Sequence, residues 1–262
     1  METLLIYLAV GAFVGLIAGL FGVGGGLVIV PVLVFVFKAQ SISSAVMVHL
    51  AIGTSLATIV FTSISSVRAH HQRGAVRWDI FRRLAPGIVV GALLGAVLAG
   101  AMPTKVLRSL FGVFELAIAA YLFWNRQPAP HRTLPGKAGM SAAGGVVGTI
   151  SAILGIGGGT LTVPFLAWCN VHLREAVATS AATGLPIAIA GAVGFVATGW
   201  NAAGLPEWAS GYLYWPAFLG IVAASIAFAP LGARLAHTIP VARLRRSFAL
   251  FLALLGVRML IG

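Results

Sequence analysis

The chain has 262 residues, of which 60% are hydrophobic and only 8% are charged. Soluble domains carry about a quarter charged residues, so this composition excludes a water-soluble fold. The 17 basic and 5 acidic residues give a net charge of +12, but the basic residues gather in short segments between apolar runs, which is typical of membrane topology signals and argues against a nucleic-acid partner.

The chain has a single cysteine, Cys169, which excludes a disulfide framework and a cysteine-based metal site. The segment Met1–Thr3 contains no basic residue. We therefore expect the first apolar run to be a membrane segment and not a cleaved signal peptide.

Ten apolar runs predict an all-α polytopic membrane protein that crosses the bilayer several times. A helix needs about 20 residues to cross the hydrocarbon layer, and most of the runs approach or exceed that length. Leu27–Phe37 and Thr160–Val171 are too short to cross unaided, which leaves open whether they span or fold back as re-entrant helices. In chain order the runs are Leu4–Phe21, Leu27–Phe37, Ala45–Ile64, Ile80–Ala101, Val106–Trp124, Ala138–Leu154, Thr160–Val171, Ala176–Thr198, Tyr212–Ala236 and Leu244–Ile261.

The two short runs occupy equivalent places in a tandem repeat. Gly22–Leu33 aligns with Gly155–Leu166 through its glycines, one valine, the proline and the final leucine. Further matches follow in the same order, including Gly95–Ala99 with Gly232–Ala236. We predict a first membrane repeat over residues 1–124, a cytoplasmic linker over 125–137 and a second membrane repeat over 138–262.

The basic residues predict that the two repeats are inverted. Val67–Arg83 contains five arginines, whereas its counterpart Gly199–Gly211 contains Glu207 and no basic residue. Positive segments mark the cytoplasmic side, so equivalent segments are expected on opposite faces and both termini outside. Inverted repeats of four to five helical segments, each broken by glycines near the midplane, are typical of secondary transporters.

The glycine-rich breaks are the first candidate binding site. Glycines let the backbone unwind and restart a short helix, whose free N–H groups and helix dipole attract an anion. The alternative is that they only allow close helix packing. The candidates are Gly22, Gly24, Gly25 and Gly26 in the first repeat, and Gly155, Gly157, Gly158, Gly159 and Thr160 in the second.

The duplicated break followed by a proline resembles the sulfite exporter TauE/SafE family, as do Ala51–Leu56, Leu94–Ala99 and Leu107–Gly112. The resemblance covers nearly the whole chain. It implies a bacterial inner-membrane permease, often associated with the export of sulfite, sulfoacetate or other organosulfur anions. The second repeat has Gly184 followed by leucine and proline where the first has Gly-Thr-Ser, which leaves open which hydroxyls of that half face the substrate.

Hydroxyl groups inside the runs are the second set of candidates, because they donate hydrogen bonds to an anion without trapping it by a full charge. The alternative is that each hydroxyl bonds back to a carbonyl of its own helix. The candidates are Thr54, Ser55, Thr179, Ser180 and Thr183.

His49, Glu115 and Arg258 fall inside predicted spans, where a buried charge is costly, so they are candidates for coupling and His49 also for substrate binding. Glu115 takes up a proton, or it pairs with Arg258 or a backbone group. A neutral, hydrogen-bonded His49 is the alternative for that residue. His70 and His71 belong to the basic segment and are expected to be solvated, and they are too weak a signal for a metal site.

The resulting hypothesis is a secondary transporter of the bacterial inner membrane that exports small organosulfur anions, with the lipid bilayer, the anion and a coupling proton or sodium ion as its partners. The alternatives are a permease for another small anion or metabolite in either direction, a membrane-embedded enzyme, and an assembly subunit. An enzyme is not expected, because no catalytic constellation of acids, histidines and a nucleophile gathers. No cofactor is predicted.

Overall fold

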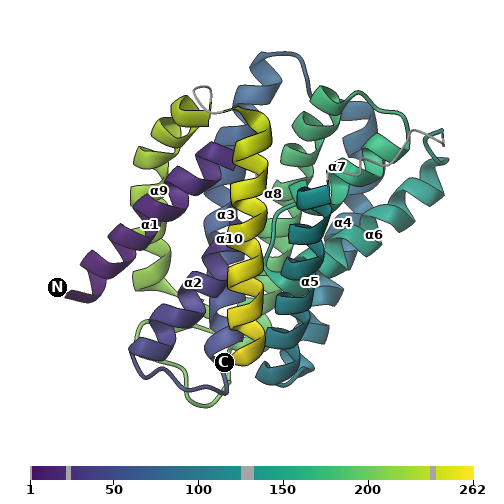
Figure 1. Ribbon diagram of the computed structural model, residues 1–262. Helices are drawn as coiled ribbons and strands as arrows, with labels where there is room; N and C mark the ends of the chain where they lie inside the picture. The colour runs from purple at the N-terminus through teal and green to yellow at the C-terminus, as the bar shows by residue number, and fades with distance from the viewer. Residues whose placement is uncertain (1, 22–24, 125–132, 237–239) are drawn as a thin grey trace.

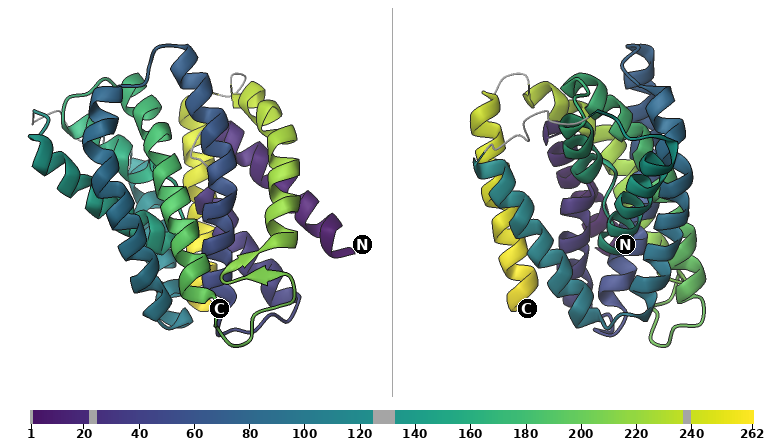
Figure 2. Two further views of the ribbon diagram at one scale, coloured as in Figure 1. Left: turned by 180° about the vertical axis from the view of Figure 1, so that it is seen from behind. Right: turned by 90° about the vertical axis from the view of Figure 1, so that its right-hand side faces the viewer.

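The computed structural model describes residues 2–21, 25–124, 133–236 and 240–262, so the predicted site residues Gly22 and Gly24 lie outside the described residues. The described residues form a helical bundle with one small hairpin, which confirms the all-α polytopic prediction (Figures 1 and 2). The elements are α1 Glu2–Phe21, α2 Gly26–Ala39, α3 Met47–Gln72, α4 Trp78–Ala101, α5 Thr104–Trp124, α6 Lys137–Leu154, α7 Gly159–Trp168, α8 Leu173–Gly199, β1 Ala209–Ser210, β2 Leu213–Tyr214, α9 Trp215–Ala236 and α10 Val241–Ile261.

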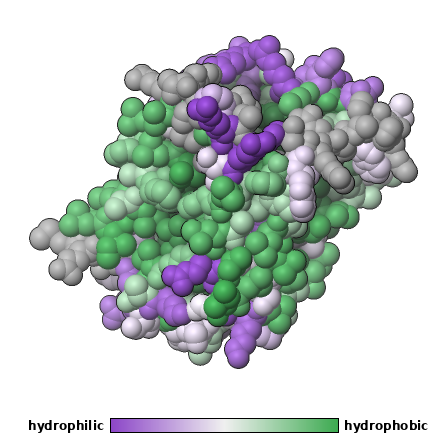
Figure 3. Space-filling view, in the orientation of Figure 1, coloured by the Kyte–Doolittle hydropathy of each residue, from purple (hydrophilic) through white to green (hydrophobic). Residues whose placement is uncertain are grey.

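On the face shown in Figure 3, a broad apolar belt lies between two more polar ends. Within the described residues, six helices are long and apolar enough to cross a membrane, namely α3, α4, α5, α6, α8 and the first 18 residues of α9. The two short predicted runs form α2, with 14 residues, and α7, with 10 residues. The chain is therefore a multi-pass membrane protein.

Two helix pairs on the flanks pack through small residues. In the α4–α6 pair, a Cβ atom added at Gly91 would lie 2.1 Å from the Gly145 carbonyl oxygen, and one added at Gly87 would lie 1.8 Å from that of Ser141. In the α1–α9 pair, a Cβ atom at Gly11 would lie 2.7 Å from the Ile221 Cα. Close backbone approach of this kind drives helix association in membranes, where the hydrophobic effect between helices is absent.

The helices of the two halves pair in equivalent ways. α1, the first helix of the first half, packs against α9, the fourth helix of the second half. In the same way α6, the first helix of the second half, packs against α4, the fourth helix of the first half. α3 and α8 meet in the centre and run antiparallel, because Gly53 approaches Phe195 while Ser63 approaches Gly184. α5 and α10 also pair, with Gly112 against Gly256.

The two glycine breaks meet between these helices. Gly25, just before α2, has a φ angle of +81°, and Gly155, just after α6, has a φ angle of +66°, a left-handed conformation that glycine adopts without strain. A Cβ atom at Gly26 would lie 2.7 Å from the Gly155 carbonyl oxygen. That oxygen also accepts a hydrogen bond of 2.9 Å from Ser55 Oγ on α3. Both breaks are thus fixed against each other.

Two boundaries differ from the sequence-based prediction. The predicted run Tyr212–Ala236 is helical only from Trp215, because Leu213 and Tyr214 form β2, which pairs with β1. The basic segment Val67–Arg83 is largely helical as well, since α3 continues to Gln72 and α4 begins at Trp78. Only a short connection remains between α3 and α4. Helices extend beyond their apolar cores into the polar ends of a membrane protein, where hydropathy no longer marks them.

Candidate functional site

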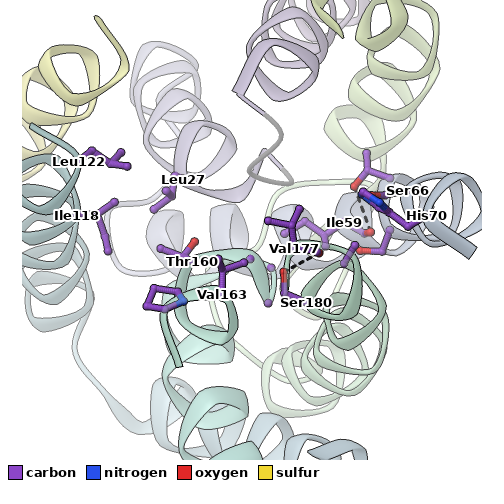
Figure 4. A pocket seen from close by; sticks show the side chains of 18 of the residues that line it. Leu27, Ile59, Ser66, His70, Ile118, Leu122, Thr160, Val163, Val177 and Ser180 are labelled. Carbon is purple, nitrogen blue, oxygen red and sulfur yellow. Dashed lines mark hydrogen bonds between the residues drawn. The ribbon is translucent and has the colours of Figure 1, made fainter. Parts of the chain in front are cut away.

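A cavity of about 320 Å³ lies at the second glycine break, between α3, α5, α7 and α8 (Figure 4). α2 and α10 contribute Leu27 and Phe248 to its wall. The volume lies at the lower end of the range for small-molecule sites, and would hold roughly ten water molecules. The remaining lining residues are Ile59, Thr62, Ser63, Ser66, His70, Ile118, Tyr121, Leu122, Gly157, Gly158, Gly159, Thr160, Val163, Pro164, Val177, Ser180, Ala181 and Gly184.

One face of α3 supplies most of the polar groups of the cavity. Ile59, Ser63, Ser66 and His70 recur at intervals of three to four residues, so they lie along one stripe of the helix. The stripe runs from the middle of α3 to its last turn. The cavity therefore reaches from the glycine break toward the end of the molecule that carries the α3–α4 connection.

The start of α7 faces the cavity. Thr162 N donates to the Gly158 carbonyl over 2.9 Å, and Gly158 at the N-cap has no side chain that caps the helix. The first backbone N–H groups of a helix have no partner within it, and they carry the positive end of the helix dipole. A Cβ atom at Gly159 would meet only Ser180 Oγ, at 4.0 Å, so the space beside this turn is open.

The structure brings five of the predicted binding residues into the cavity wall, namely Gly157, Gly158, Gly159, Thr160 and Ser180. In the close-up view Thr160 lies between Leu27 and Val163, while Ser180 lies beside Ile59 on α3 (Figure 4). The other predicted residues that the structure describes are outside this wall: Gly25, Gly26, His49, Thr54, Ser55, Gly155, Thr179 and Thr183.

Two of the predicted hydroxyls bind the backbone of a helix connection instead. Thr54 Oγ1 on α3 accepts a hydrogen bond of 3.1 Å from Tyr214 N, directly before α9. Thr179 Oγ1 on α8 accepts one of 3.0 Å from Arg77 N, directly before α4. Each threonine thus anchors the residue that precedes a helix of the other half. Both side chains are fully buried, and neither reaches the cavity.

Thr183 lies just behind the cavity wall. Its hydroxyl donates to the Ser180 carbonyl over 2.9 Å and lies 3.3 Å from Thr162 Oγ1 on α7. Ser180 Oγ donates to the Val177 carbonyl over 3.1 Å, so the hydroxyl can donate to an anion in the cavity only by turning away from that carbonyl. Back-bonding of this kind was the alternative interpretation of these hydroxyls, and the structure shows it for both residues.

His49 joins three elements at the start of α3. Its Nε2 lies 3.1 Å from both the Ala99 and Met102 carbonyl oxygens at the end of α4, so this nitrogen carries the proton. The ring stacks on Tyr212 with a centroid distance of 4.8 Å. His49 is therefore the hydrogen-bonded histidine of the alternative interpretation, and it lies outside the cavity.

Glu115 and Arg258 are not paired. Glu115 on α5 is fully buried, and neither carboxylate oxygen has a hydrogen-bond partner among the described residues. Arg258 near the end of α10 is exposed. The sequence left open an ion pair between Glu115 and Arg258, and the structure does not form it. α10 contacts α5 through Gly256, and Arg258 points away from that contact.

The α3–α4 connection carries an ion-pair cluster. Arg77 contacts Asp79 at 2.9 Å and Glu175, at the start of α8, at 3.2 Å. The hydrogen bonds that its guanidinium donates to the two carboxylates raise the pKa of Arg77, so this group stays charged at any working pH. Among the described residues, no group of three or more His, Cys, Asp or Glu side chains is placed to hold a metal ion.

Sequence reasoning missed the polar stripe of α3 and the α5 wall of the cavity. Thr62 and Ser63 stand at the end of the apolar run, and Ser66 follows them by four and three residues, which is helical spacing and a detectable signal. His70 was expected to be solvated, but it is half-buried and lines the cavity. Ile118 and Leu122 gave no signal, since apolar side chains on a membrane helix face lipid and cavity alike.

A family model described as sulfite exporter TauE/SafE matches residues 7–259. A probable membrane transporter protein of Haemophilus influenzae is 36% identical over 257 residues, covering 98% of this chain and 97% of the relative. One from Methanocaldococcus jannaschii is 27% identical over 260 residues, covering 96% and 93%. A third, from Bacillus subtilis, is 31% identical over 178 residues, covering 61% and 65%. No solved structure matches the chain.

Proposed function

The chain belongs to the sulfite exporter TauE/SafE family, and on that premise we propose that it is a secondary transporter that moves small organosulfur anions, such as sulfite or a sulfonate, out of the cytoplasm. The names of its relatives support membrane transport and name no substrate. The proposal assigns the cavity at the second glycine break as the binding site. Under this proposal the protein is a transporter and not an enzyme.

The chemistry of the cavity carries this proposal. Its described lining contains the hydroxyls of Thr62, Ser63, Ser66, Thr160 and Ser180 and no carboxylate or fully charged cation. The open first turn of α7 adds backbone N–H groups and the positive end of a helix dipole. Such partial charges bind an anion weakly enough to release it, which a transporter requires.

Alternating access follows from two inverted halves, which remain a prediction of the sequence. The antiparallel α3–α8 pair and the exchanged pairs α1–α9 and α4–α6 support it. Basic residues are dense at the end that carries the α3–α4 connection and the start of α10, while the C-terminus lies at the opposite end (Figure 1). By the positive-inside rule we assign the α3–α4 end to the cytoplasm and the termini to the periplasm of a bacterial inner membrane. The cavity then faces inward.

Transport by purified protein in proteoliposomes tests the proposal. The panel contains sulfite, sulfoacetate, thiosulfate and sulfate, with acetate as the carboxylate control. We expect saturable transport of at least one sulfur anion and none of acetate. Preferred transport of acetate would support the alternative of a permease for another small anion. Absence of transport for the entire panel contradicts the proposed function.

A matched pair of variants tests the site. Ser180→Ala removes a hydroxyl from the cavity wall, whereas Ser225→Ala removes a buried hydroxyl of α9 that bonds back to its own helix in the same way. We expect Ser180→Ala to raise the apparent Kd for the transported anion several-fold, because a hydrogen bond to a charged group is stronger than the helix bond that the hydroxyl gives up to make it. We expect Ser225→Ala to leave the apparent Kd unchanged. Equal affinities in both variants would place the site elsewhere.

A further inference from the structure

The burial of Glu115 in the middle of α5 is unexplained by the packing around it. The side chain is fully buried, and both carboxylate oxygens lack hydrogen-bond partners among the described residues. An ionised carboxylate is strongly disfavoured in such a place, because neither water nor a counter-charge replaces its hydration. A side chain that only filled space between α5 and α10 would be apolar.

Glu115 lies one helical turn below the cavity. Ile118 and Leu122 line the cavity, and they follow Glu115 at positions three and seven along α5, so the three side chains share one face of the helix. The Cα atoms of Glu115 and Ile118 are about 5 Å apart along the helix axis. Across the contact, a Cβ atom added at Gly256 of α10 would lie 3.1 Å from Glu115 Cβ, so α10 seals this side without a polar group.

No charged neighbour balances the carboxylate. α5 packs against α10, α3 and α6, and none of the ionisable groups on these helices makes an ion pair or hydrogen bond with Glu115 within the described part of the chain. These groups are Lys105, Arg108 and Tyr121 on α5, Arg243, Arg245, Arg246 and Arg258 on α10, His49, Arg68, His70 and His71 on α3, and Lys137 on α6. Within the described residues, no counter-charge would balance an ionised Glu115, so this environment favours the neutral, protonated carboxyl group.

Resting on the proposed function, we propose that Glu115 binds the proton that travels with the anion, so that the protein is a proton–anion symporter. A proton fits this site better than a sodium ion, because hard cations are held by several oxygen ligands, whereas no hydroxyl group hydrogen-bonds to the carboxylate among the described residues. The proton needs only the carboxylate itself. It arrives from water in the cavity and leaves to water when the site faces the other side, regenerating the carboxylate.

The short separation between Glu115 and the cavity couples the two ligands. A bound anion disfavours a second negative charge one helical turn away, so it raises the affinity of Glu115 for a proton. By linkage, a protonated Glu115 raises the affinity of the cavity for the anion by the same factor. Anion and proton then cross together. For a monovalent anion the movement carries no net charge. Export from the cytoplasm then requires an outward anion gradient that is steeper than the inward proton gradient.

The test compares wild type, Glu115→Gln, Glu115→Asp and Glu207→Gln in proteoliposomes, with [35S]sulfite as the probe or, if sulfite is not carried, the panel anion that moves fastest. Glu207 is exposed in the α8–α9 connection and serves as the matched control. We expect an imposed pH gradient to drive accumulation in wild type and Glu207→Gln. Glu115→Gln should lose that response while it still exchanges labelled for unlabelled anion. Glu115→Asp should retain part of it.

An infrared measurement reports on the proton without any substrate. The C=O band of a protonated carboxyl group should be present in the wild-type protein and in Glu207→Gln, should shift in D₂O, and should be missing in Glu115→Gln. This band does not depend on which anion is transported. If no panel anion moves, the proposed function fails, while the infrared difference still decides whether Glu115 holds a proton.

Three results would overturn the inference. The first is pH-driven accumulation by Glu115→Gln equal to that of wild type. The second is an infrared spectrum without a carboxyl band that depends on Glu115 at any pH at which the protein remains folded. Loss of both accumulation and exchange in Glu115→Gln, in a protein that stays monodisperse, also contradicts it, since a coupling residue is dispensable for exchange.

Discussion

The α3–α4 connection and the α8–α9 connection lie at opposite ends of the molecule and are held in the same way. Each gives the backbone N–H of its last residue to a buried threonine of the opposite central helix, Arg77 to Thr179 and Tyr214 to Thr54. The two connections differ in the side chains that they pack against the central helices. The first places the small residues Ala75 and Val76 against α8, whereas the second inserts a tyrosine-rich hairpin.

The difference agrees with the position of the cavity, which opens at the end that carries the α3–α4 connection. Tyr214 meets Phe37 and Tyr7 edge to face, with centroids 5.7 and 5.9 Å away, and Tyr212 stacks on His49. These rings fill the end of the bundle that faces the hairpin. At the other end Ser66 and His70 line a cavity. In alternating access, a transporter opens its binding site to one side of the membrane while the other side is closed. A cavity at one end and packed aromatic rings at the other match that arrangement.

The largest expected effect is a difference in accessibility between the two ends of α3. On a Cys169→Ser background, Ser66→Cys should react with a water-soluble maleimide, because it lines the cavity. Leu50→Cys, at a fully buried position near the hairpin end, should stay unreacted in the folded protein and react after denaturation. Mass spectrometry over a time course measures both. Comparable labelling of the two cysteines would remove the asymmetry.

Next in size is a steric test of the hairpin. Gly53→Ala places a Cβ atom 2.2 Å from the Tyr212 carbonyl oxygen, a backbone atom that cannot rotate away. We expect a loss of about 3 kcal/mol or more in stability, seen as a much lower Tm in detergent.

The control for this variant lies in the other connection. Gly74 has a φ angle of +64° and no atom within 4 Å of an added Cβ. Gly74→Ala should therefore cost only about 1–2 kcal/mol of backbone strain. A Tm for Gly53→Ala that is no lower than that of Gly74→Ala contradicts the tight seating of the hairpin.

The two threonine anchors should differ moderately. Thr54→Val leaves the Tyr214 N–H buried and unpaired, which should cost about 2–3 kcal/mol. Thr179→Val frees the Arg77 N–H in a partly exposed place, where water replaces the bond, and should cost about 1 kcal/mol. Thermal unfolding compares them. Anion Kd should be unchanged in both variants, and a tenfold loss of affinity in either one would return that hydroxyl to the binding site.

The smallest effect belongs to the ion pairs of the first connection. Arg77 and its partners are between one third and one half exposed, so Glu175→Gln should cost at most about 1 kcal/mol and less at high salt. The guanidinium does not titrate at a working pH, since its pKa is raised. Tm measured at low and high ionic strength gives the difference. A cost that stays the same at high salt would show that Glu175 acts through packing and not through its charge.

The sequence predicted the helical membrane class and the two short helices correctly, because these depend on local composition. It was less informative about hydroxyls. Ser180 reaches the cavity while Thr179, its neighbour, anchors a connection, and on a helix adjacent residues point about 100° apart. It also took His70 to be solvated, because hydropathy ends before α3 does.

Local pattern thus determined that this chain is a polytopic helical protein with paired glycine breaks, since a helix in lipid satisfies its own backbone and needs only length and apolar side chains. Tertiary structure alone decided which break borders a cavity and which face of α3 lines it. From Met47 to Ile59 every residue of α3 is buried, so no amphipathic stripe marks an inner side. Only the neighbouring helices and the inserted hairpin give those faces different surroundings.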